Sequence, residues 1–275
     1  MLDYVMPMKE QINDKNYISL LENRKGKIEF YNRVRKYFAQ PFIKRYLDTE
    51  VIGFEKILKN ESCIFVTHHC LYFDSILLGA VFDKKIHGWI AENVFLKRKN
   101  LYECLELIPV KTSIGTSTST SHEERNEIMK AYQKTRELSI FWLRNTSDAI
   151  TTTNDGLAEC CLSKTQGVID LNERKNHSGA ANLAYESNSD SKKNILVFPI
   201  SCWIPGEQRE KLLIAEGKWG WKSILYLEKE RRIPCKIYIN DPLSSRTYNH
   251  KKKLQEEIRK RQIDGYNLLE KISKN

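Results

Sequence analysis

Short runs rich in β-branched and aromatic residues alternate along this chain with segments of helical periodicity, and this alternation restricts the fold more than any other feature. Strands separated by helices pair in parallel, because each helix carries the chain back to the start of the next strand. We therefore predict an α/β fold with a largely parallel central sheet flanked by helices. The predicted strands are Cys63–Thr67, Ile86–Ala91, Glu106–Val110, Ser139–Leu143, Asn194–Ile200 and Ile233–Ile239. The predicted helices cover residues 74–83, 93–104, 120–136, 179–187 and 251–272.

A basic amphipathic segment precedes the first of these strands. Residues 23–46 hold eight Lys and Arg residues and one acidic residue, Glu29, in a chain whose formal net charge is +10. Apolar residues in this segment have helical spacing, and basic residues lie between them: Phe30, Val34, Tyr37 and Phe38 are the apolar set, and Arg33, Arg35 and Lys36 the basic one. Pro41 should end or kink this helix.

Such a helix suits an anionic membrane surface or an acidic partner protein, and it equally suits an ordinary helix whose basic face is solvated. Nucleic acid is a weaker candidate, because no recognition motif accompanies the charge. If the helix binds a membrane or a partner, Arg33, Arg35 and Lys36 are the expected contacts. We expect an N-terminal amphipathic helical region at residues 1–48, followed by a single α/β domain at residues 49–275.

The composition is that of a globular protein outside the bilayer. No stretch reaches the roughly 20 apolar residues of a transmembrane helix, because polar residues interrupt the most apolar segment, Cys63–Phe82. The N-terminus lacks the basic and apolar regions of a secretory signal. We expect a cytoplasmic protein that can also bind peripherally to the inner face of a membrane. The seven cysteines are odd in number and scattered, so we expect reduced thiols.

Two polar stretches interrupt the alternation of strands and helices. They are Thr112–Ser121 and Asn145–Ser178. The second is longer than the connections of most compact domains. We predict surface loops at both places and treat residues 145–178, which include Cys160 and Cys161, as an insertion.

The strongest candidate site follows the strand Cys63–Thr67. His68 and His69 come directly after this strand, and Asp74 opens the apolar helix beyond. Ligands of α/β proteins bind at the carboxyl ends of the strands, where this turn is expected. An imidazole there can act as a general base near neutral pH, and a carboxylate bonded to its second nitrogen orients the ring. His69 and Asp74 are thus a candidate catalytic dyad.

Other interpretations of these residues stay open from the motif alone. Asp74 can be a helix N-cap, with the histidines as ordinary polar residues. A metal site is disfavoured, because adjacent histidines on a strand point to opposite faces and a spaced third ligand is missing. Cys70 can be a nucleophile beside His69, but inert thiols are commoner. The sequence has no Gly-x-Ser-x-Gly elbow, phosphate-binding glycine loop or dinucleotide fingerprint, which removes support for the familiar hydrolases, nucleoside triphosphatases and dehydrogenases.

The segment from Thr67 to Asp74 resembles the first motif of the glycerolipid acyltransferases, which include bacterial lysophosphatidic acid acyltransferases. That motif is Asn-His-x-Ser-x-x-Asp after a strand, and here His68 stands at the Asn place and Leu71 at the Ser place. Further stretches are similar to the family's approach strand, to its second-motif region, and to the helix and strand after its third motif: Glu50–Ile57; Glu92–Phe95 with Leu107–Val110; and Ser178–Ala184 with Ile195–Ile200.

The resemblance implies transfer of a fatty acyl group from a thioester of coenzyme A or acyl carrier protein to an acceptor hydroxyl or amine. His69 would take the acceptor's proton as the acceptor attacks the thioester carbonyl, and Asp74 would orient the ring. Backbone N–H groups at the start of the following helix would help to stabilise the oxyanion. We expect no acyl-enzyme, no cofactor and no metal ion.

Two further motifs of the family are altered in this chain. The third motif, Phe-Pro-Glu-Gly-Thr-Arg, compares with Phe141–Thr146, where the acid and the glycine are missing, and the arginine of the second motif falls near Thr112. The residues expected to bind the acceptor are therefore Lys111, Thr112, Trp142 and Arg144. With the arginines altered, we expect an acceptor other than a glycerol phosphate. The alternatives are a catalytically silent relative that binds lipid or carrier protein, and a thioester hydrolase.

Overall fold

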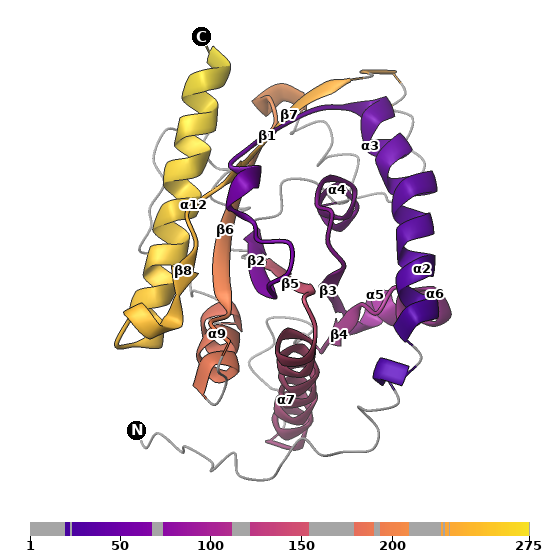
Figure 1. Cartoon of the computed structure of the whole chain (residues 1–275), viewed down its shortest axis with the longest axis vertical. Coiled ribbons are helices and arrows are strands. Elements are labelled where there is room, and N and C mark those ends of the chain that lie inside the picture. The colour runs from indigo at the N-terminus through magenta and orange to yellow at the C-terminus, as the bar shows by residue number, and fades with distance from the viewer. Residues whose placement is uncertain are drawn as a thin grey trace.

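Helices cover both faces of one central β-sheet in this computed structural model (Figure 1). The structure describes residues 20–22, 24–67, 74–111, 122–153, 179–189, 193–208, 227, 229–230 and 232–274. The strands are β1 (Leu47–Ile52), β2 (Cys63–Thr67), β3 (Ile86–Ala91), β4 (Ile108–Val110), β5 (Ala149–Thr153), β6 (Leu196–Trp203), β7 (Ile233–Ile239) and β8 (Leu243–Ser244). The α-helices are α2 (Arg24–Val34), α3 (Gln40–Tyr46), α4 (Asp74–Val81), α5 (Glu92–Lys97), α6 (Lys99–Cys104), α7 (His122–Asn145), α9 (Gly179–Ser189) and α12 (Lys251–Lys274).

The sheet is mixed, with mostly parallel strands. Its order is β1-β7-β6-β2-β5-β3-β4, with β8 beside β6. The strands from β6 to β4 in this order run parallel to one another. β7 is antiparallel to β6, and β1 is parallel to β7. This arrangement confirms the predicted α/β fold class.

The core is divided between the two faces of the sheet. On one face, Leu77 and Leu78 of α4 pack with Ile43 of α3. On the other face, α7, α9 and α12 bury side chains such as Leu143 and Leu183. All five residues of β2 are buried, because β2 is a central strand with helices on both sides, and this explains its uninterrupted Cys-Ile-Phe-Val-Thr sequence.

One predicted strand is wrong. The segment Ser139–Leu143 forms the last turns of α7, which ends at Asn145. Its helical pattern was obscured because this end of α7 is buried, so four successive residues, 140–143, are apolar. The strand lies after it instead, at β5, inside the segment 145–178 that we expected to be an insertion. Residues 154–178 lie outside the described residues.

The remaining predicted elements overlap the observed ones, but the helix predicted at 93–104 is divided into α5 and α6, and the one predicted at 120–136 continues to Asn145 as α7. β2, β3 and β7 have the predicted bounds, and β4 is shorter, at Ile108–Val110. Helix α3 ends at Tyr46, and β1 begins at Leu47, next to the expected boundary after residue 48. The helices before this boundary share the core with the sheet, since Ile43 and Tyr46 are buried in it.

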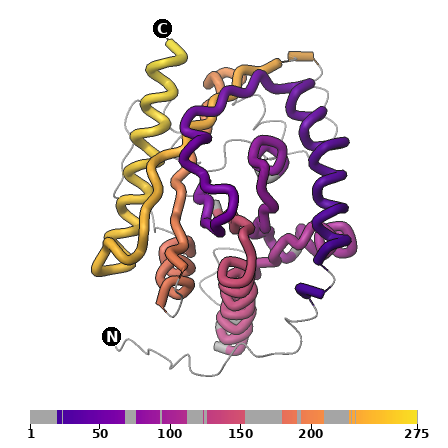
Figure 2. The backbone as a smooth tube through the Cα atoms, in the orientation of Figure 1, coloured from indigo at the N-terminus to yellow at the C-terminus, as the bar shows by residue number. Residues whose placement is uncertain are grey.

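The N-terminal helix does not stop at Pro41. A π-helical segment at Arg35–Ala39 joins α2 to α3, and Pro41 lies at the start of α3. The tube in Figure 2 follows this helical run without a break. Proline is tolerated in a first helical turn, and the π-helical segment before it changes the local hydrogen-bond pattern. Of the two outcomes expected at Pro41, an end or a kink, the helix end is therefore wrong.

No helix within the described residues is both long and apolar enough to cross a membrane.

Candidate functional site

The candidate catalytic motif joins a central strand to a helix. β2 ends at Thr67, and α4 begins at Asp74. Residues 68–73, with His69, lie outside the described residues, as does the side chain of Asp74. The strand expected before the motif and the helix expected after it are confirmed, and the pairing of His69 with Asp74 stays a prediction.

The carboxyl ends of the parallel strands meet at one edge of the sheet, which we call the carboxyl edge. Thr67 of β2 is aligned with Thr153 of β5, and Ala91 of β3 with Val110 of β4. The motif therefore starts at the carboxyl edge, where α/β proteins bind their ligands. Lys111, directly after β4, belongs to the same edge.

The N-terminal helix holds α4 at its last turn. Arg35 donates a hydrogen bond from Nε to the carbonyl of Gly79 at 3.1 Å and pairs with Asp83 at 2.7 Å. Gln40 donates to the carbonyl of Ala80 at 3.3 Å. These donors satisfy carbonyl groups at the helix end and orient α4, and with it the backbone of Asp74. Arg35, expected to bind a membrane or partner, thus has an internal role.

Lys111 is the predicted acceptor-binding residue that the structure describes at the carboxyl edge. Its Nζ forms an ion pair with Glu127 of α7 at 3.3 Å, and the lysine side chain is about one third exposed. Exposed pairs of this kind are weak. Lys111 can therefore exchange Glu127 for another anion. Thr112 lies outside the described residues.

Trp142 and Arg144 lie at the opposite edge, because α7 runs back to the start of β5. Trp142 is buried and stacks on His87 with ring centroids 4.6 Å apart. Arg144 donates to the carbonyls of Glu186 at 2.6 Å and Ser187 at 3.3 Å, at the end of α9. We compared residues 141–146 with the third motif of the family and predicted a strand at Ser139–Leu143. That segment is the end of α7. Their positions give no support to an acceptor-binding role.

A His–Asp pair that the sequence analysis missed lies at the opposite edge, which we call the amino edge because the parallel strands start there. Nε2 of His87 is 2.8 Å from Asp148 Oδ2, and Nδ1 is 3.0 Å from the carbonyl oxygen of Glu106. Arg24 of α2 also pairs with Asp148. The pair is buried, with His87 fully enclosed. His87 looked like an isolated residue in an apolar strand, and no local pattern indicated its distant partner.

The charges around this pair make it a structural cluster. Burial raises the pKa of Asp148, but the hydrogen bond and charge of His87 and the charge of Arg24 outweigh it, so the net pKa lies below the ordinary value. Lys85 pairs with Glu106 at 3.2 Å, and Lys27 of α2 approaches the same carboxylate at 3.7 Å. Arg24 and Lys27 of α2 therefore form ion pairs with buried carboxylates, and these pairs hold α2 against the sheet.

The described cysteines, Cys63, Cys104, Cys202 and Cys235, form no disulfide. Burial raises the pKa of Cys63 to about 12, so its thiolate is not accessible at neutral pH. Cys70, Cys160 and Cys161 lie outside the described residues.

Comparison with solved structures finds a similar fold. The crystal structure of the 1-acyl-sn-glycerophosphate (LPA) acyltransferase PlsC from Thermotoga maritima aligns with a TM-score of 0.54 and 15% sequence identity. The alignment covers 93% of this chain and 86% of that chain. No protein-family model and no curated protein matches the sequence. The likeness therefore establishes the fold, over nearly the whole length of both proteins.

Proposed function

We propose that this protein is an acyltransferase that moves a fatty acyl group from a thioester to a hydroxyl or amine acceptor, with His69 as general base and Asp74 as the group that orients it. One observation carries the proposal. The His-x-x-x-x-Asp segment begins two residues after the buried strand β2 and ends at the first residue of α4, in a fold similar to that of an acyltransferase. The fold alone supports many chemistries, so the motif's position in it is what favours this one.

In the proposed reaction, the imidazole of His69 takes the proton from the acceptor hydroxyl as the oxygen attacks the thioester carbonyl. Collapse of the tetrahedral intermediate breaks the C–S bond, and the leaving thiolate takes the proton from the imidazolium. N–H groups in the first turn of α4 are suited to stabilise the oxyanion, because they have no partner within the helix. The donor is a thioester of coenzyme A or of acyl carrier protein.

Product analysis after incubation with one acyl thioester and a panel of acceptors tests the proposal. We expect an acylated acceptor with the parent protein and none with His69→Ala. Free fatty acid in place of an acylated acceptor would indicate a thioester hydrolase. Binding without turnover would indicate a silent lipid-binding or carrier-binding protein.

The acceptor should be something other than a glycerol phosphate. A phosphate dianion that lost its water without a bidentate partner would be bound several kcal/mol less favourably, on the order of a hundredfold or more in affinity. The arginine of the second motif is replaced near Thr112, and Arg144 is held by the end of α9. We expect lysophosphatidic acid to be turned over at least about tenfold less efficiently than a non-phosphorylated alcohol of similar chain length.

Steady-state kinetics with one fixed acyl thioester measure this preference. Lys111→Ala and Arg144→Ala are a matched pair, because one basic residue lies at each edge of the sheet. Efficient turnover of lysophosphatidic acid that is lost in either variant would contradict the prediction and restore a role in phospholipid synthesis.

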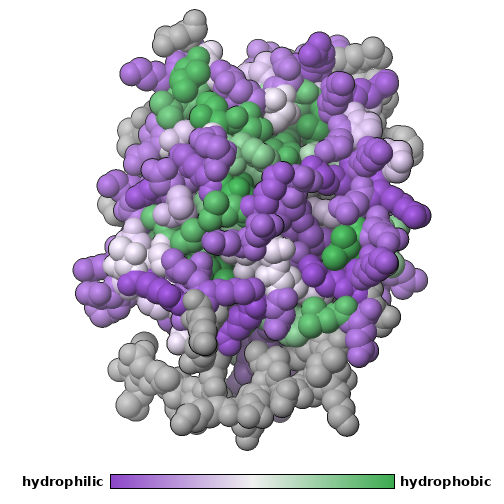
Figure 3. Space-filling view, in the orientation of Figure 1, coloured by the Kyte–Doolittle hydropathy of each residue, from purple (hydrophilic) through white to green (hydrophobic). Residues whose placement is uncertain are grey.

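We also propose that the exposed side of the N-terminal helix binds an anionic membrane surface. Phe38 and Tyr37 are 55% and 71% exposed, so part of the apolar face of this helix is exposed to solvent. Lys36 lies over the ring of Tyr37, and Arg33 is also exposed. Figure 3 shows hydrophobic patches within a hydrophilic surface on the side of α2. Aromatic and basic side chains together favour a membrane interface.

Charge reversal at Arg33 and Lys36 should weaken binding to vesicles that contain anionic lipid. Each basic residue near such a surface contributes about 1 kcal/mol, so we expect a loss of at least tenfold, and added salt should weaken the parent protein similarly. Vesicle sedimentation measures the effect. Reversal of Lys253 and Lys260, which are exposed on α12, is the control with the same change in net charge. Equal loss in both double variants, or binding to acyl carrier protein alone, would contradict a membrane role for α2.

A further inference from the structure

The short helices α5 and α6 form a corner that starts at the carboxyl edge of the sheet. α5 begins at Glu92, directly after β3 ends at Ala91, and Arg98 alone separates α5 from α6. We call residues 92–104 the α5–α6 corner. On its inner side Phe95 is buried, and the ring centroids of Phe95 and Tyr102 are 6.0 Å apart. This aromatic pair packs the corner on the domain.

The outer side of the α5–α6 corner exposes leucine side chains to solvent. Leu96 is 62% exposed and Leu101 is 40% exposed, one on each side of Arg98, and Val94 is exposed as well. Single exposed apolar residues are common, whereas a group of them marks an interaction surface. Apolar side chains that stay in water add little to the free energy of unfolding. Folding stability therefore does not account for leucines at these two positions.

Basic side chains accompany the exposed leucines. Lys97, Arg98 and Lys99 are consecutive and exposed. Lys99 pairs with Glu103 at 3.7 Å, but within the part of the chain that the structure describes neither Lys97 nor Arg98 forms an ion pair. Leucines that enter the acyl boundary of a bilayer, beside basic residues that reach the lipid phosphates, are typical of a membrane interface. The charge of the corner thus complements an anionic lipid surface.

The α5–α6 corner adjoins the helix α2, for which we proposed membrane binding. α6 contacts α2, and Figure 1 shows it near the first turns of that helix. Lys27 of α2 also pairs with Glu106, two residues after the end of α6, at 3.7 Å. Two neighbouring elements therefore expose apolar and basic side chains together. An extended lipid surface can contact both at once, which favours a membrane over the acidic helix of a partner protein.

We propose that the α5–α6 corner is a second membrane contact, in which Leu96 and Leu101 enter the surface of an anionic bilayer and Lys97 and Arg98 pair with lipid phosphates. The inference rests on the proposed function at a membrane and extends it beyond α2. Because α5 starts at the carboxyl edge, this contact brings that edge to the bilayer. An amphiphilic acyl acceptor partitions into the bilayer, so the contact places the candidate site beside the source of its acceptor.

Two double variants test the proposal by sedimentation with vesicles of phosphatidylcholine and phosphatidylglycerol in equal parts. Leu96→Ser with Leu101→Ser should lower the affinity at least about tenfold and leave its salt dependence unchanged, because the basic residues remain. Lys97→Gln with Arg98→Gln should lower it about tenfold and make it less sensitive to salt. The charge variant keeps the proposal testable if the serine variant does not fold.

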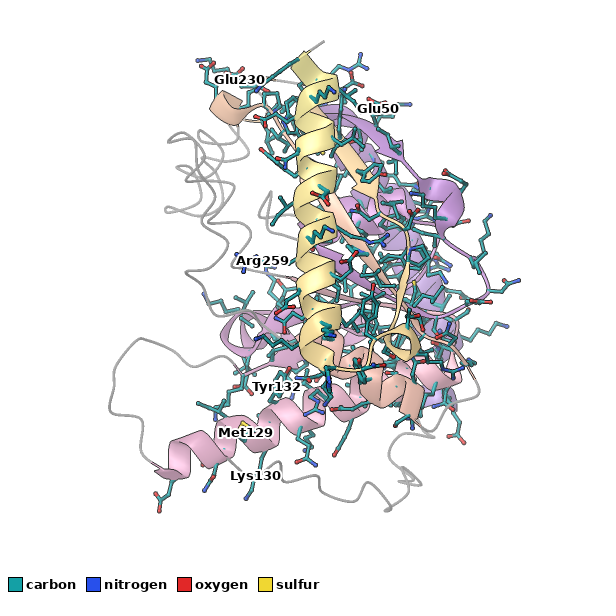
Figure 4. The ribbon with its side chains drawn as sticks, turned by 90° about the vertical axis from the view of Figure 1, so that its left-hand side faces the viewer. Glu50, Met129, Lys130, Tyr132, Glu230 and Arg259 are labelled. Atoms are coloured by element: carbon teal, nitrogen blue, oxygen red, sulfur yellow. The ribbon has the colours of Figure 1, made fainter. Side chains whose placement is uncertain are left out.

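Helix α12 supplies the matched control, because it exposes similar residues on the other side of the molecule. It lies on the left in Figure 1, with α5 and α6 on the right, and it faces the viewer in Figure 4, where Arg259 is labelled. Leu268 and Ile272 of α12 are exposed. Leu268→Ser with Ile272→Ser should bind the vesicles as the parent does. An equal loss of affinity in this control would overturn the proposal.

The other occupants of this surface have distinct outcomes. An unchanged vesicle affinity in the Leu96 and Leu101 variant, or a parent protein that does not bind these vesicles, would overturn the proposal. So would binding to acyl carrier protein that this variant alone loses, or a parent dimer that the variant converts to a monomer. Turnover of a soluble short-chain thioester should survive in both double variants. Failure of the proposed acyl transfer appears instead as a parent protein without turnover that depends on His69.

Discussion

Replacement of His69 by alanine should lower kcat for acyl transfer by about 10²- to 10⁴-fold, the contribution of a general base, while the protein stays folded. Asp74→Asn should lower kcat strongly as well, because an amide can hold the imidazole in the wrong tautomer. Initial rates with a soluble acyl thioester measure both effects, and thermal unfolding checks the fold.

The neighbours of His69 supply the controls for this experiment. His68→Ala removes an adjacent imidazole, and Cys70→Ala removes the nearest thiol, and both should be mild. If Cys70→Ala abolishes turnover and an acyl-cysteine adduct is trapped, then the direct transfer to the acceptor is wrong and the reaction proceeds through a covalent intermediate.

Asp148→Ala should produce the largest loss of stability, about 3–5 kcal/mol, because it leaves His87 and Arg24 without their shared carboxylate in a buried place. Urea denaturation at pH 7 measures this loss. The exposed Asp241, which pairs with Lys56 at 2.9 Å, is the control, and Asp241→Ala should change the free energy of unfolding by less than about 1 kcal/mol. Turnover in Asp148→Ala at a temperature where it is folded should be retained. A complete loss of turnover there would make His87–Asp148 a catalytic pair.

The lowered pKa of Asp148 also predicts how the free energy of unfolding changes in acid. The pKa of Asp148 is lower in the folded protein than its ordinary value of 3.8, so its contribution to stability is complete above that pH and is lost as the pH falls through the folded value. The difference in unfolding free energy between the parent and Asp148→Ala should therefore shrink below about pH 4. A difference that is the same at pH 7 and pH 3 would contradict the ion-pair account.

Local pattern was sufficient where a segment has one environment along its length. β2, β3 and β7 have the predicted bounds, because short runs rich in β-branched and aromatic residues between turn residues have few alternatives. Pattern misled us where burial changes along an element. The buried end of α7 at Ser139–Leu143 has the composition of a strand, and β5, which is central in the sheet, was included in the polar stretch 145–178 that we predicted to be a loop.

The sequence by itself determined the α/β class and singled out the candidate catalytic motif, because strand and helix periodicity and the His-x-x-x-x-Asp spacing are properties of short segments. Only the tertiary structure decided which edge of the sheet each residue occupies. It places Trp142 and Arg144 at the edge opposite the candidate site. It also formed the pairs His87–Asp148 and Gln262–Val66, whose members are 61 and 196 residues apart. Such pairs depend on the order in which the strands assemble, and no local periodicity encodes that order.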